Sequence, residues 1–357
     1  MFNKIAYYHF KSLYEIVFNE CERRGEYVVT ISDVANATGL STTTVSRVLN
    51  HYPYVAEETR NAVLKAVEQL GYIPNNAAQT LRRQKTNTIA VLVPRLTNPF
   101  FSHLIEKIEV EAAKMGMQIL ICHTRYSKQK EMEYLYLLNT KQVDGIIMTS
   151  IENKWKDIYK LIRNDPIVLC NEYVNEANVP IIRLNQVEGG YIGTKHLIEK
   201  GHTKIGYCSG GILSGVGFDR FQGYKQAMEE YELEIKQEWL FNDTFSDLDG
   251  RRVIHCIASL PDRPSAFFAG SDEVAVGMIS EAKKINMKVP DDIAVIGFDD
   301  QFIAQIVEPA LTTIHQPIQK IGEFTMQAMV QLLRSQTISN KREVFELPLS
   351  LIVRESS

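Results

Sequence analysis

Segment 31–50 has the residue pattern of two short helices joined by a tight turn. Ala35 is small enough to let the second helix cross close to the first, and Gly39 supplies the positive φ that such a turn requires. Val45 and Val48 are then placed to hold the second helix against the first. This spacing predicts a helix-turn-helix, a unit whose second helix typically enters the major groove of DNA.

Capping residues and a third helix support this interpretation. Thr30 with Asp33 has the sequence of a capping box before the first helix, and Ser41 can cap the second helix. A third amphipathic helix is predicted over residues 57–70. Its expected core positions are Val63, Leu64, Val67 and Leu70. The three helices predict an all-α DNA-binding domain over residues 29–74, in preference to a purely structural bundle.

The exposed face of the second helix offers side chains suited to base edges. Arg47 can donate two hydrogen bonds to guanine, and Thr42 and Thr43 each offer a hydroxyl and a methyl group suited to thymine. The plainer alternative is a solvated helix face, because short polar residues are common on any exposed helix.

The same region matches a known family. Residues 41–50 (STTTVSRVLN), followed by 71–75 (GYIPN) and 77–81 (AAQTL), resemble the lactose repressor/galactose repressor (LacI/GalR) family of bacterial transcriptional regulators. The resemblance implies that DNA is contacted by Thr30, Ser41, Thr42, Thr43, Thr44, Ser46, Arg47, Asn50, Thr59, Asn75, Ala78 and Leu81. Within this set, it implies base contacts for Thr42, Thr43 and Arg47, phosphate contacts for Asn50 and Thr59, and a minor-groove wedge for Leu81.

Residues 75–86 are predicted to form a hinge helix and linker. An isolated helix shorter than about 12 residues is marginal in water, so we expect this one to become ordered on DNA. Two hinges of a dimer would then insert Leu81 between base pairs, and the bent DNA would offset the cost of unstacking. The alternative is a plain polar linker over residues 80–85.

Residues 1–28 precede the recognisable motif. Glu15 and Glu20 interrupt any apolar segment and no small-residue cleavage site follows, so we do not expect a signal peptide. Residues 23–26 (RRGE) are what a purine-rich ribosome-binding sequence would encode if translated in frame, with Val28 as the true start. The hypothesis is that this extension is an artefact, and the amino-terminal peptide of protein made from the native gene would decide it.

Composition and charge fit a modular regulator. A chain of 357 residues has room for about two to three domains. The net charge of -4 argues against a generally basic coat, so attraction to DNA is expected to be local to the amino-terminal domain and hinge. The five cysteines are far apart and form no CxxC pair. Cys122, Cys170 and Cys208 lie in apolar runs, which predicts buried core residues in a reducing, cytoplasmic compartment.

From residue 87 onward, apolar strands alternate with amphipathic helices, which predicts an α/β fold with parallel sheets. Strands are expected at 88–93, 118–122, 145–148, 167–170, 181–184, 205–208, 266–269, 293–296 and 349–354. So many strands predict two doubly wound lobes that face a cleft, with the ligand at the carboxyl ends of the strands.

The family resemblance continues through this region. It is carried by residues 97–101 (TNPFF), 143–147 (VDGII), 220–224 (RFQGY) and 289–300 (VPDDIAVIGFDD). It implies a periplasmic-binding-protein-like core for effector binding and dimerisation over residues 87–357, whose chain crosses between the lobes three times. The expected first lobe comprises about 87–184 and 316–345, and the second about 185–314, with a carboxyl-terminal strand that crosses back.

By the same resemblance, the effector-contacting residues are Phe101, Asn171, Arg220, Phe245, Ser271, Asp272 and Asp299, with Phe298 as a further candidate for the cleft wall. A guanidinium and a carboxylate can bracket vicinal hydroxyls while aromatic faces cover a sugar ring, so a sugar or sugar phosphate is the expected effector. A purine or another small metabolite is the alternative. Asp272 could instead cap the helix that follows it, and Phe245 could be an ordinary core residue.

No catalytic motif is recognisable, because the GxGxxG, P-loop, HExxH and GxSxG spacings are absent and the eight histidines do not cluster. We therefore expect no enzymatic activity, cofactor or metal. A transport-type solute-binding protein would share the two-lobed core but needs export and has no helix-turn-helix. The expected function is repression of a carbohydrate uptake or catabolism operon by a homodimer on a pseudo-palindromic operator, with no membrane partner. A tetramer is not expected because no heptad tail follows. The effector is an inducer or a corepressor.

Overall fold

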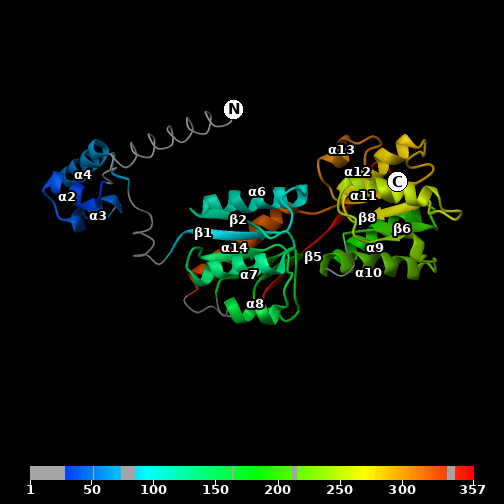
Figure 1. Cartoon of the computed structure of the whole chain (residues 1–357), viewed down its shortest axis with the longest axis horizontal. Helices are drawn as coiled ribbons and strands as arrows, with labels where there is room; N and C mark the ends of the chain where they lie inside the picture. Colours follow the sequence, from blue (N-terminus) through cyan, green and yellow to red (C-terminus); the bar gives the residue numbers. More distant parts are fainter. Residues whose placement is uncertain (1–28, 51, 74–84, 163–164, 211–214, 336–341) are drawn as a thin grey trace, which may run out of the picture. The chain divides into compact units, whose positions relative to one another are not determined.

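The computed structural model describes residues 29–50, 52–73, 85–162, 165–210, 215–335 and 342–357. The chain divides into two compact units, Met1–Arg83 and Gln84–Ser357, and Figure 1 labels many of their helices and strands. Among the described residues, no helix is long and apolar enough to span a bilayer, and no group of three or more His, Cys, Asp or Glu side chains is placed to hold a metal ion.

The described part of the first unit contains the helices α2 (Ile31–Thr38), α3 (Thr42–Leu49) and α4 (Glu57–Leu70). Gly39 ends α2 with φ +66°, the left-handed conformation that the turn into α3 requires. This arrangement confirms the predicted helix-turn-helix and third helix.

The predicted helix caps are also present. The Asp33 carboxylate accepts hydrogen bonds from the backbone nitrogen and the hydroxyl of Thr30, at 2.8 and 2.7 Å. Ser41 Oγ accepts a hydrogen bond from the backbone nitrogen of Thr44 at 3.1 Å. Each cap satisfies backbone groups that have no partner inside the helix, and so fixes where the helix begins.

The core of this unit differs from the prediction on α4. Its buried residues are Val34, Ala35, Val45, Val48, Val63 and Ala66, with Val67 packed against them. Leu64 is 47% exposed, because it lies one residue from Val63 and therefore about 100° away around the helix. Leu70 has the right spacing, but it is the last residue of α4 and stays 37% exposed. The prediction that these two leucines close the core is wrong.

The second unit contains two six-stranded sheets. The first sheet has the order β11-β5-β4-β3-β1-β2, with all pairs parallel. Its strands are β1 (Thr88–Val93), β2 (Gln118–His123), β3 (Gly145–Met148), β4 (Ile167–Cys170), β5 (Ile181–Leu184) and β11 (Val344–Leu347). The helices of this lobe are α6 (Pro99–Lys114), α7 (Lys128–Asn139), α8 (Trp155–Ile162) and α14 (Ile318–Arg334). We call this half lobe 1.

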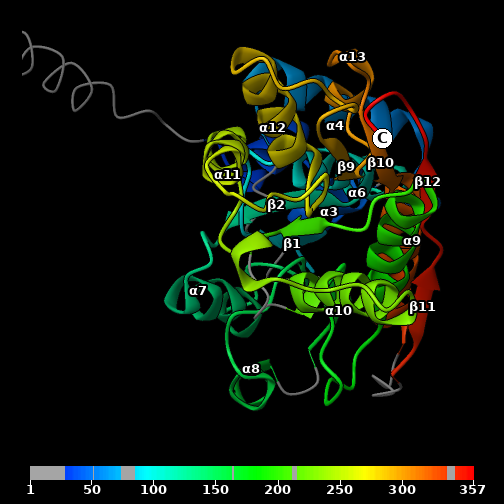
Figure 2. The same cartoon turned by 90° about the vertical axis from the view of Figure 1, so that its right-hand side faces the viewer.

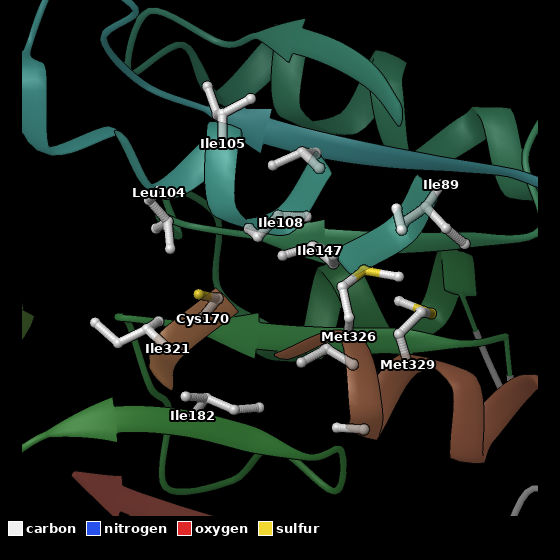
Figure 3. Close-up of a cluster of buried hydrophobic side chains, with 14 of the residues drawn as sticks. Ile89, Leu104, Ile105, Ile108, Ile147, Cys170, Ile182, Ile321, Met326 and Met329 are labelled. Atoms are coloured by element: carbon white, nitrogen blue, oxygen red, sulfur yellow. The ribbon is translucent and has the colours of Figure 1, made fainter. Parts of the chain in front are cut away.

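Both faces of the lobe 1 sheet are buried. Alternate residues of β1 point to opposite faces, so that Ile89 and Val91 join one core cluster and Ala90 and Leu92 join the other. Figure 3 shows the first cluster, in which strand residues such as Cys170 meet side chains of α6 and α14. The second cluster packs under α7 and α8. This layering accounts for the continuous apolar strands of the sequence.

Lobe 2 has the sheet order β12-β10-β9-β8-β6-β7. Its strands are β6 (Ile205–Cys208), β7 (Leu240–Phe241), β8 (Ala266–Ala269), β9 (Ala294–Asp299), β10 (Thr312–His315) and β12 (Ser350–Ile352). Strand β12 runs antiparallel to β10. The helices are α9 (Gln186–Glu199), α10 (Gly215–Glu230), the 3-10 turn η1 (Gln237–Trp239), α11 (Asp247–Ala258), α12 (Asp272–Lys284) and α13 (Ile303–Ile306).

The helices of lobe 2 also cover both faces of its sheet. Figure 2 shows α11 and α12 above, with α9 and α10 below them. Cys208 is buried in the α11 and α12 cluster, while Phe298 is buried in the α9 and α10 cluster. The predicted fold class, a helical unit followed by two doubly wound lobes, is confirmed. The three cysteines predicted to be buried, Cys122, Cys170 and Cys208, are buried.

The chain passes between the lobes at three places, from β5 to α9, from β10 to α14 and from β11 to β12. Strands β5, β10 and β11 therefore end at the boundary between the lobes. In parallel sheets the carboxyl ends of the strands meet at one edge, and ligands bind there. The fold thus directs the loops that follow the strands of both lobes toward a shared cleft.

Candidate functional site

The solvent face of α3 carries the polar residues that were predicted to contact DNA. Ser41, Thr42, Thr43, Arg47 and Asn50 are exposed, while Thr44 and Ser46 are half-buried. The opposite face of α3 is buried in the core of the unit. Thr30 is exposed before α2, and Thr59 is half-buried in α4. An exposed polar helix face on a small rigid unit is the form in which a helix reads the major groove.

Arg47 has a neighbour that the sequence did not predict. Its guanidinium lies 5.8 Å from the centre of the Tyr52 ring, and Arg60 Nη2 donates a hydrogen bond to the Tyr52 carbonyl at 3.1 Å. Tyr52 therefore restricts Arg47 from one side. Tyr52 follows α3 in a turn that has no periodic pattern, so sequence reasoning gave no signal for it.

The side chain of Asn50 turns back on its own helix. Its Nδ2 donates to the Ser46 carbonyl oxygen at 2.7 Å and lies 3.3 Å from Ser46 Oγ. The remaining predicted contacts, Asn75, Ala78 and Leu81, lie outside the described residues and stay sequence predictions.

The charge of the helix-turn-helix unit is lower than the sequence interpretation assumed. Between residues 29 and 73 the basic residues are Arg47, Arg60 and Lys65, and the acidic ones are Asp33, Glu57, Glu58 and Glu68. This unit thus has no excess of positive charge. The expectation that attraction to DNA is local to this domain and the hinge stays a prediction, and within this region the excess of basic residues, Arg82, Arg83 and Lys85, lies in the hinge and linker.

A second candidate site lies between the two lobes. A cavity of about 450 Å³ is lined by the loops that follow β1, β2, β3 and β4 of lobe 1 and β6, β7 and β8 of lobe 2, together with α10 and the end of β9. Of the residues predicted to contact the effector, it is lined by Phe101, Asn171, Arg220, Phe245, Ser271 and Asp299. Its size and its concave, two-sided form are typical of a small-molecule site.

Arg220 of α10 is buried and held in place by protein groups. Its Nε donates to Gln186 Oε1 at 2.8 Å, its Nη1 donates to the Gly270 carbonyl at 2.6 Å, and its guanidinium lies 3.5 Å from the centre of the Phe298 ring. Burial lowers the pKa of Arg220, and the nearby Asp299 carboxylate opposes that shift. Phe298, a candidate for the cleft wall, is fully buried and supports the guanidinium from behind.

Asp299 ends β9 and faces the same cavity. Its carboxylate accepts hydrogen bonds from Gln301 Nε2, at 2.9 Å, and from Gln316 Nε2. Burial raises the pKa of Asp299 to about 6, even though Arg220 acts in the opposite direction. The φ of Asp299 is +112°, a conformation that costs free energy in a residue with a side chain and that is concentrated at functional sites.

Asp272 does not line the cavity, so its predicted effector contact is not supported. It is fully buried, and its carboxylate accepts hydrogen bonds from Thr313 Oγ1 and from the backbone nitrogen of Gln301. Asp272 therefore fixes the loop after β9 to α12. Ser271 does line the cavity, although its Oγ also accepts from the Val274 nitrogen as the cap of α12.

The sequence interpretation missed most of the other lining residues, among them Arg95, Tyr126, Glu152 and Glu172. These four follow β1, β2, β3 and β4, so the rule that ligands meet the carboxyl ends of strands contained the signal. The Tyr126 ring lies 6.3 Å from that of Phe245, across the cleft. Burial raises the pKa of Glu172 to about 8, and the negative charge of Glu152 adds to this rise.

The cavity also contains buried polar atoms that a ligand could reach. Asn171 Oδ1 meets no hydrogen-bond partner among the described residues, and the hydroxyls of Ser150, Ser209 and Thr244 line the same cavity. Buried polar groups are rarely left unpaired in native proteins. Such a set in one cavity is suited to a ligand with several hydroxyl or amino groups.

Comparisons with known proteins identify relatives of both parts of the chain. Residues 30–75 match the model for bacterial regulatory proteins of the lacI family, and residues 194–357 match that for a periplasmic binding protein-like domain. The chain is 44% identical to the NTD biosynthesis operon regulator NtdR of Bacillus subtilis (strain 168), over 92% of this chain and 99% of that protein. It is 34% identical to the HTH-type transcriptional repressor PurR of Vibrio vulnificus, over 92% and 98% respectively.

Solved structures show the same fold. The lac repressor dimer bound to operator and an anti-inducer superposes with a TM-score of 0.83, at 24% identity, over 92% of this chain and 98% of that one. A LacI family transcriptional regulator from Lactobacillus casei, solved with bound glucose, gives a TM-score of 0.69 at 33% identity, over 76% and 99%. The chain therefore belongs to the LacI family of bacterial regulatory proteins and is a DNA-binding transcriptional regulator.

Proposed function

We propose that this protein is a repressor that binds a pseudo-palindromic operator as a homodimer and is controlled by a small polyol bound between its lobes. The observation that carries the proposal is the cavity itself. Lobe 2 contributes a fixed guanidinium at Arg220, and lobe 1 contributes unpaired acceptors such as Asn171 Oδ1. A ligand that contacts both lobes stabilises one arrangement of them, which is the requirement for allosteric control.

A sugar-like effector suits the lining. Phe101, Tyr126 and Phe245 offer aromatic surface, while the Ser150, Ser209 and Thr244 hydroxyls offer hydrogen bonds. The relative from Lactobacillus casei has been solved with glucose and with sucrose, which supports the same ligand class here. The regulated genes would then serve uptake or catabolism of a carbohydrate, and the protein would act on the chromosome in the bacterial cytoplasm.

A corepressor-dependent regulator is the second candidate. The relatives named PurR, at 34% identity, favour a metabolite other than a sugar, such as a purine. The two candidates differ in the sign of regulation, because an inducer releases the operator whereas a corepressor strengthens binding to it.

The first test is selection of bound fragments from the source genome by the purified full-length protein, at one stated salt concentration. The proposal expects enrichment of palindromic sites beside carbohydrate genes. A parallel selection with a panel of sugars and purines would identify the effector by the change in occupancy. No enrichment under any of these conditions would contradict a DNA-binding repressor.

A further inference from the structure

Two carboxyl groups of lobe 1, those of Glu152 and Glu172, line the effector cavity. Glu152 follows β3 and Glu172 follows β4, so both belong to lobe 1 and both line the cavity. Among the residues that the structure describes, neither forms an ion pair. Carboxylates that are largely removed from water normally have a charged or hydrogen-bonding partner.

The two arginines of the cavity are already engaged elsewhere. Arg95 forms an ion pair with Glu273 at 3.6 Å and donates to the Phe245 carbonyl at 2.7 Å. Arg220 donates hydrogen bonds to Gln186 and Gly270, and the nearby Asp299 carboxylate favours its positive charge. The charge of each arginine is thus offset within the protein. The carboxyl groups of Glu152 and Glu172 therefore remain for the ligand to contact.

A separate observation points to a donor-rich ligand at the same place. Asn171 precedes Glu172 in the chain, is only 6% exposed, and its Oδ1 meets no hydrogen-bond partner in the described protein. A side-chain oxygen of this kind can only accept hydrogen bonds. Asn171 also has φ +68°, so its orientation toward the cavity is held in a conformation that few residues adopt.

The electrostatics around Glu172 favour a cation. Burial raises its pKa to about 8, the charges of Glu152 and of Asp219 on α10 raise it further, and the Val216 backbone N–H and Arg220 on α10 lower it. The Glu152 pKa is raised by burial and by Glu131, and lowered by Lys128. A positive charge between these glutamates would favour their ionised forms, so that binding of a cation would release protons.

We propose that the effector carries a protonated primary amine, as an amino sugar does, and that Glu172, Glu152 and the Asn171 side-chain oxygen bind its ammonium group. An ammonium has three N–H donors, which match these three acceptors. The hydroxyls of the sugar would contact Arg220, Asp299 and the hydroxyl groups that line the cavity. This inference rests on the proposed function, because it concerns the ligand of the same cleft.

The test compares amines with their neutral counterparts on the full-length protein in an amine-free phosphate buffer at neutral pH. The pairs are glucosamine with glucose, galactosamine with galactose, and Tris with pentaerythritol, in which an ammonium replaces a hydroxyl or hydroxymethyl group. Calorimetric titration measures the dissociation constants. We expect at least one amine to bind about tenfold or more tightly than its counterpart, the size of a hydrogen bond to a charged group.

Glu172→Gln should remove that preference, so that each amine binds within about twofold of its neutral counterpart, because the amide keeps the shape and loses the charge. Glu152→Gln provides a second variant if the first does not fold, and should weaken the preference in the same direction. Glu133→Gln, an exposed position on α7, is the matched control and should change neither dissociation constant.

Equal binding of amines and neutral compounds by the natural protein overturns the proposal, as does a preference that survives both cleft substitutions, or the absence of binding by every amine. Operator occupancy measured in the same samples separates this result from the proposed function. Neutral sugars that change occupancy as much as amines would preserve the regulator and refute the amine site. Amines that bind without changing occupancy would preserve the site and refute its regulatory role.

Discussion

Arg220 is positioned before any ligand arrives. Its hydrogen bonds to Gln186 and Gly270 and its packing on Phe298 fix the guanidinium at the wall of the cavity. A side chain that is already ordered loses little conformational entropy when it binds a ligand, so such a residue contributes strongly to affinity. Its position on α10 also places it in lobe 2, opposite Asn171 of lobe 1.

Arg220→Ala should therefore abolish the response to effector while operator affinity without effector stays within about twofold. Without this contact from lobe 2, the effector no longer binds one arrangement of the lobes more tightly than the other, so it cannot shift the equilibrium between the two arrangements. Operator titrations with and without effector measure both quantities. Loss of operator binding by a folded dimer would contradict the role assigned to Arg220.

Glu172 should make the stability of the ligand-free protein depend on pH. Its pKa is about 8 in the folded protein and near the ordinary 4.5 when unfolded, so between these values the folded protein holds the additional proton. The contribution of Glu172 to the free energy of unfolding is therefore fully present below about pH 4.5 and is lost as the pH rises toward 8.

Because Glu172→Gln lacks this titration, its melting temperature should rise relative to the natural protein as the pH increases across that window. The corresponding change in free energy is on the order of a few kcal/mol. Thermal unfolding of both proteins at a series of pH values, without ligand, measures the difference. A constant difference between the two proteins would show that the Glu172 pKa is not raised.

Arg47 provides the prediction for DNA. Arg47→Ala should cost about 1 to 3 kcal/mol in discrimination between operator and scrambled DNA, the value of one bidentate contact to guanine. Lys65→Ala, an exposed cation on α4, is the control and should leave that ratio unchanged. The two binding constants should be measured at one salt concentration. A uniform loss on both DNAs after Arg47→Ala would indicate a phosphate contact instead.

At the scale of the elements, helices α9 and α10 pack with their backbones in contact. A Cβ on Gly190 of α9 would lie 2.1 Å from the Arg220 carbonyl oxygen, and one on Gly223 of α10 would lie 2.0 Å from the Val187 carbonyl oxygen. These atoms are backbone and cannot turn aside. The close approach of the two helices thus sets the position of Arg220.

Gly190→Ala should push α10 away from α9, destabilise the protein by about 1 to 3 kcal/mol and weaken effector binding. Gly322→Ala is the control, because its Cβ would meet Lys107 across the α14 and α6 contact in lobe 1, far from Arg220 in the chain. It should lower stability without a comparable loss of effector affinity. Denaturant unfolding and effector titration of the two variants separate the effects.

The sequence predicted most of the central strands well because both of their faces are buried. Strands β1, β3, β4, β6 and β8 have the predicted bounds, and their residues are almost all apolar. The central strand β10 was not predicted although it is buried, because Thr312, Thr313 and His315 interrupt its apolar signal. The edge strands β7 and β11 were not predicted, since their residues are mostly half-exposed and carry no continuous apolar signal. Strand β12 is shorter than the predicted segment 349–354.

The candidate site could be predicted only in part, for a different reason. Asn171 directly follows the apolar strand β4, and Asp299 is the last residue of β9. Such positions predict that both residues lie at the edge of the sheet where ligands bind. Glu152 stands in a loop without periodicity, and only its place in the loop after β3 indicates that it can face the cavity. Asp272 was predicted to contact the effector but is directed into the protein. A carboxylate at the first position of a helix can point in either direction, and here the hydrogen bond from Thr313, on a strand distant in sequence, holds it inside the protein.

At the scale of the whole second unit, Arg95 joins the two lobes. It belongs to lobe 1, and it contacts the Phe245 carbonyl and Glu273 of lobe 2. Tyr173 makes a similar connection, since its hydroxyl donates to Asp219 Oδ2 of lobe 2 at 2.8 Å. These contacts can exist only when the lobes are close, so they contribute to the free energy of closure.

Arg95→Ala should therefore weaken effector binding about two- to tenfold, because an ion pair that is partly exposed contributes modestly and the closed form would be less populated. Lys156→Ala, an exposed cation on α8, serves as the control. Calorimetric titration gives the affinities. An unchanged affinity after Arg95→Ala would mean that this bridge does not contribute to closure.

The passage of the chain between the lobes has a consequence for protein synthesis. Lobe 2 is built almost entirely from one uninterrupted stretch, from α9 to β10, to which later residues add the edge strand β12. Lobe 1 begins earlier in the chain, but its α14 and β11 are synthesised much later. Leu104 and Ile108 of α6 therefore have no Ile321 and Met326 to pack against until α14 has been made. On the ribosome, lobe 2 can therefore form all but its edge strand before lobe 1 receives α14 and β11, and a nascent chain would expose this apolar surface of lobe 1 to chaperones while lobe 2 is being made.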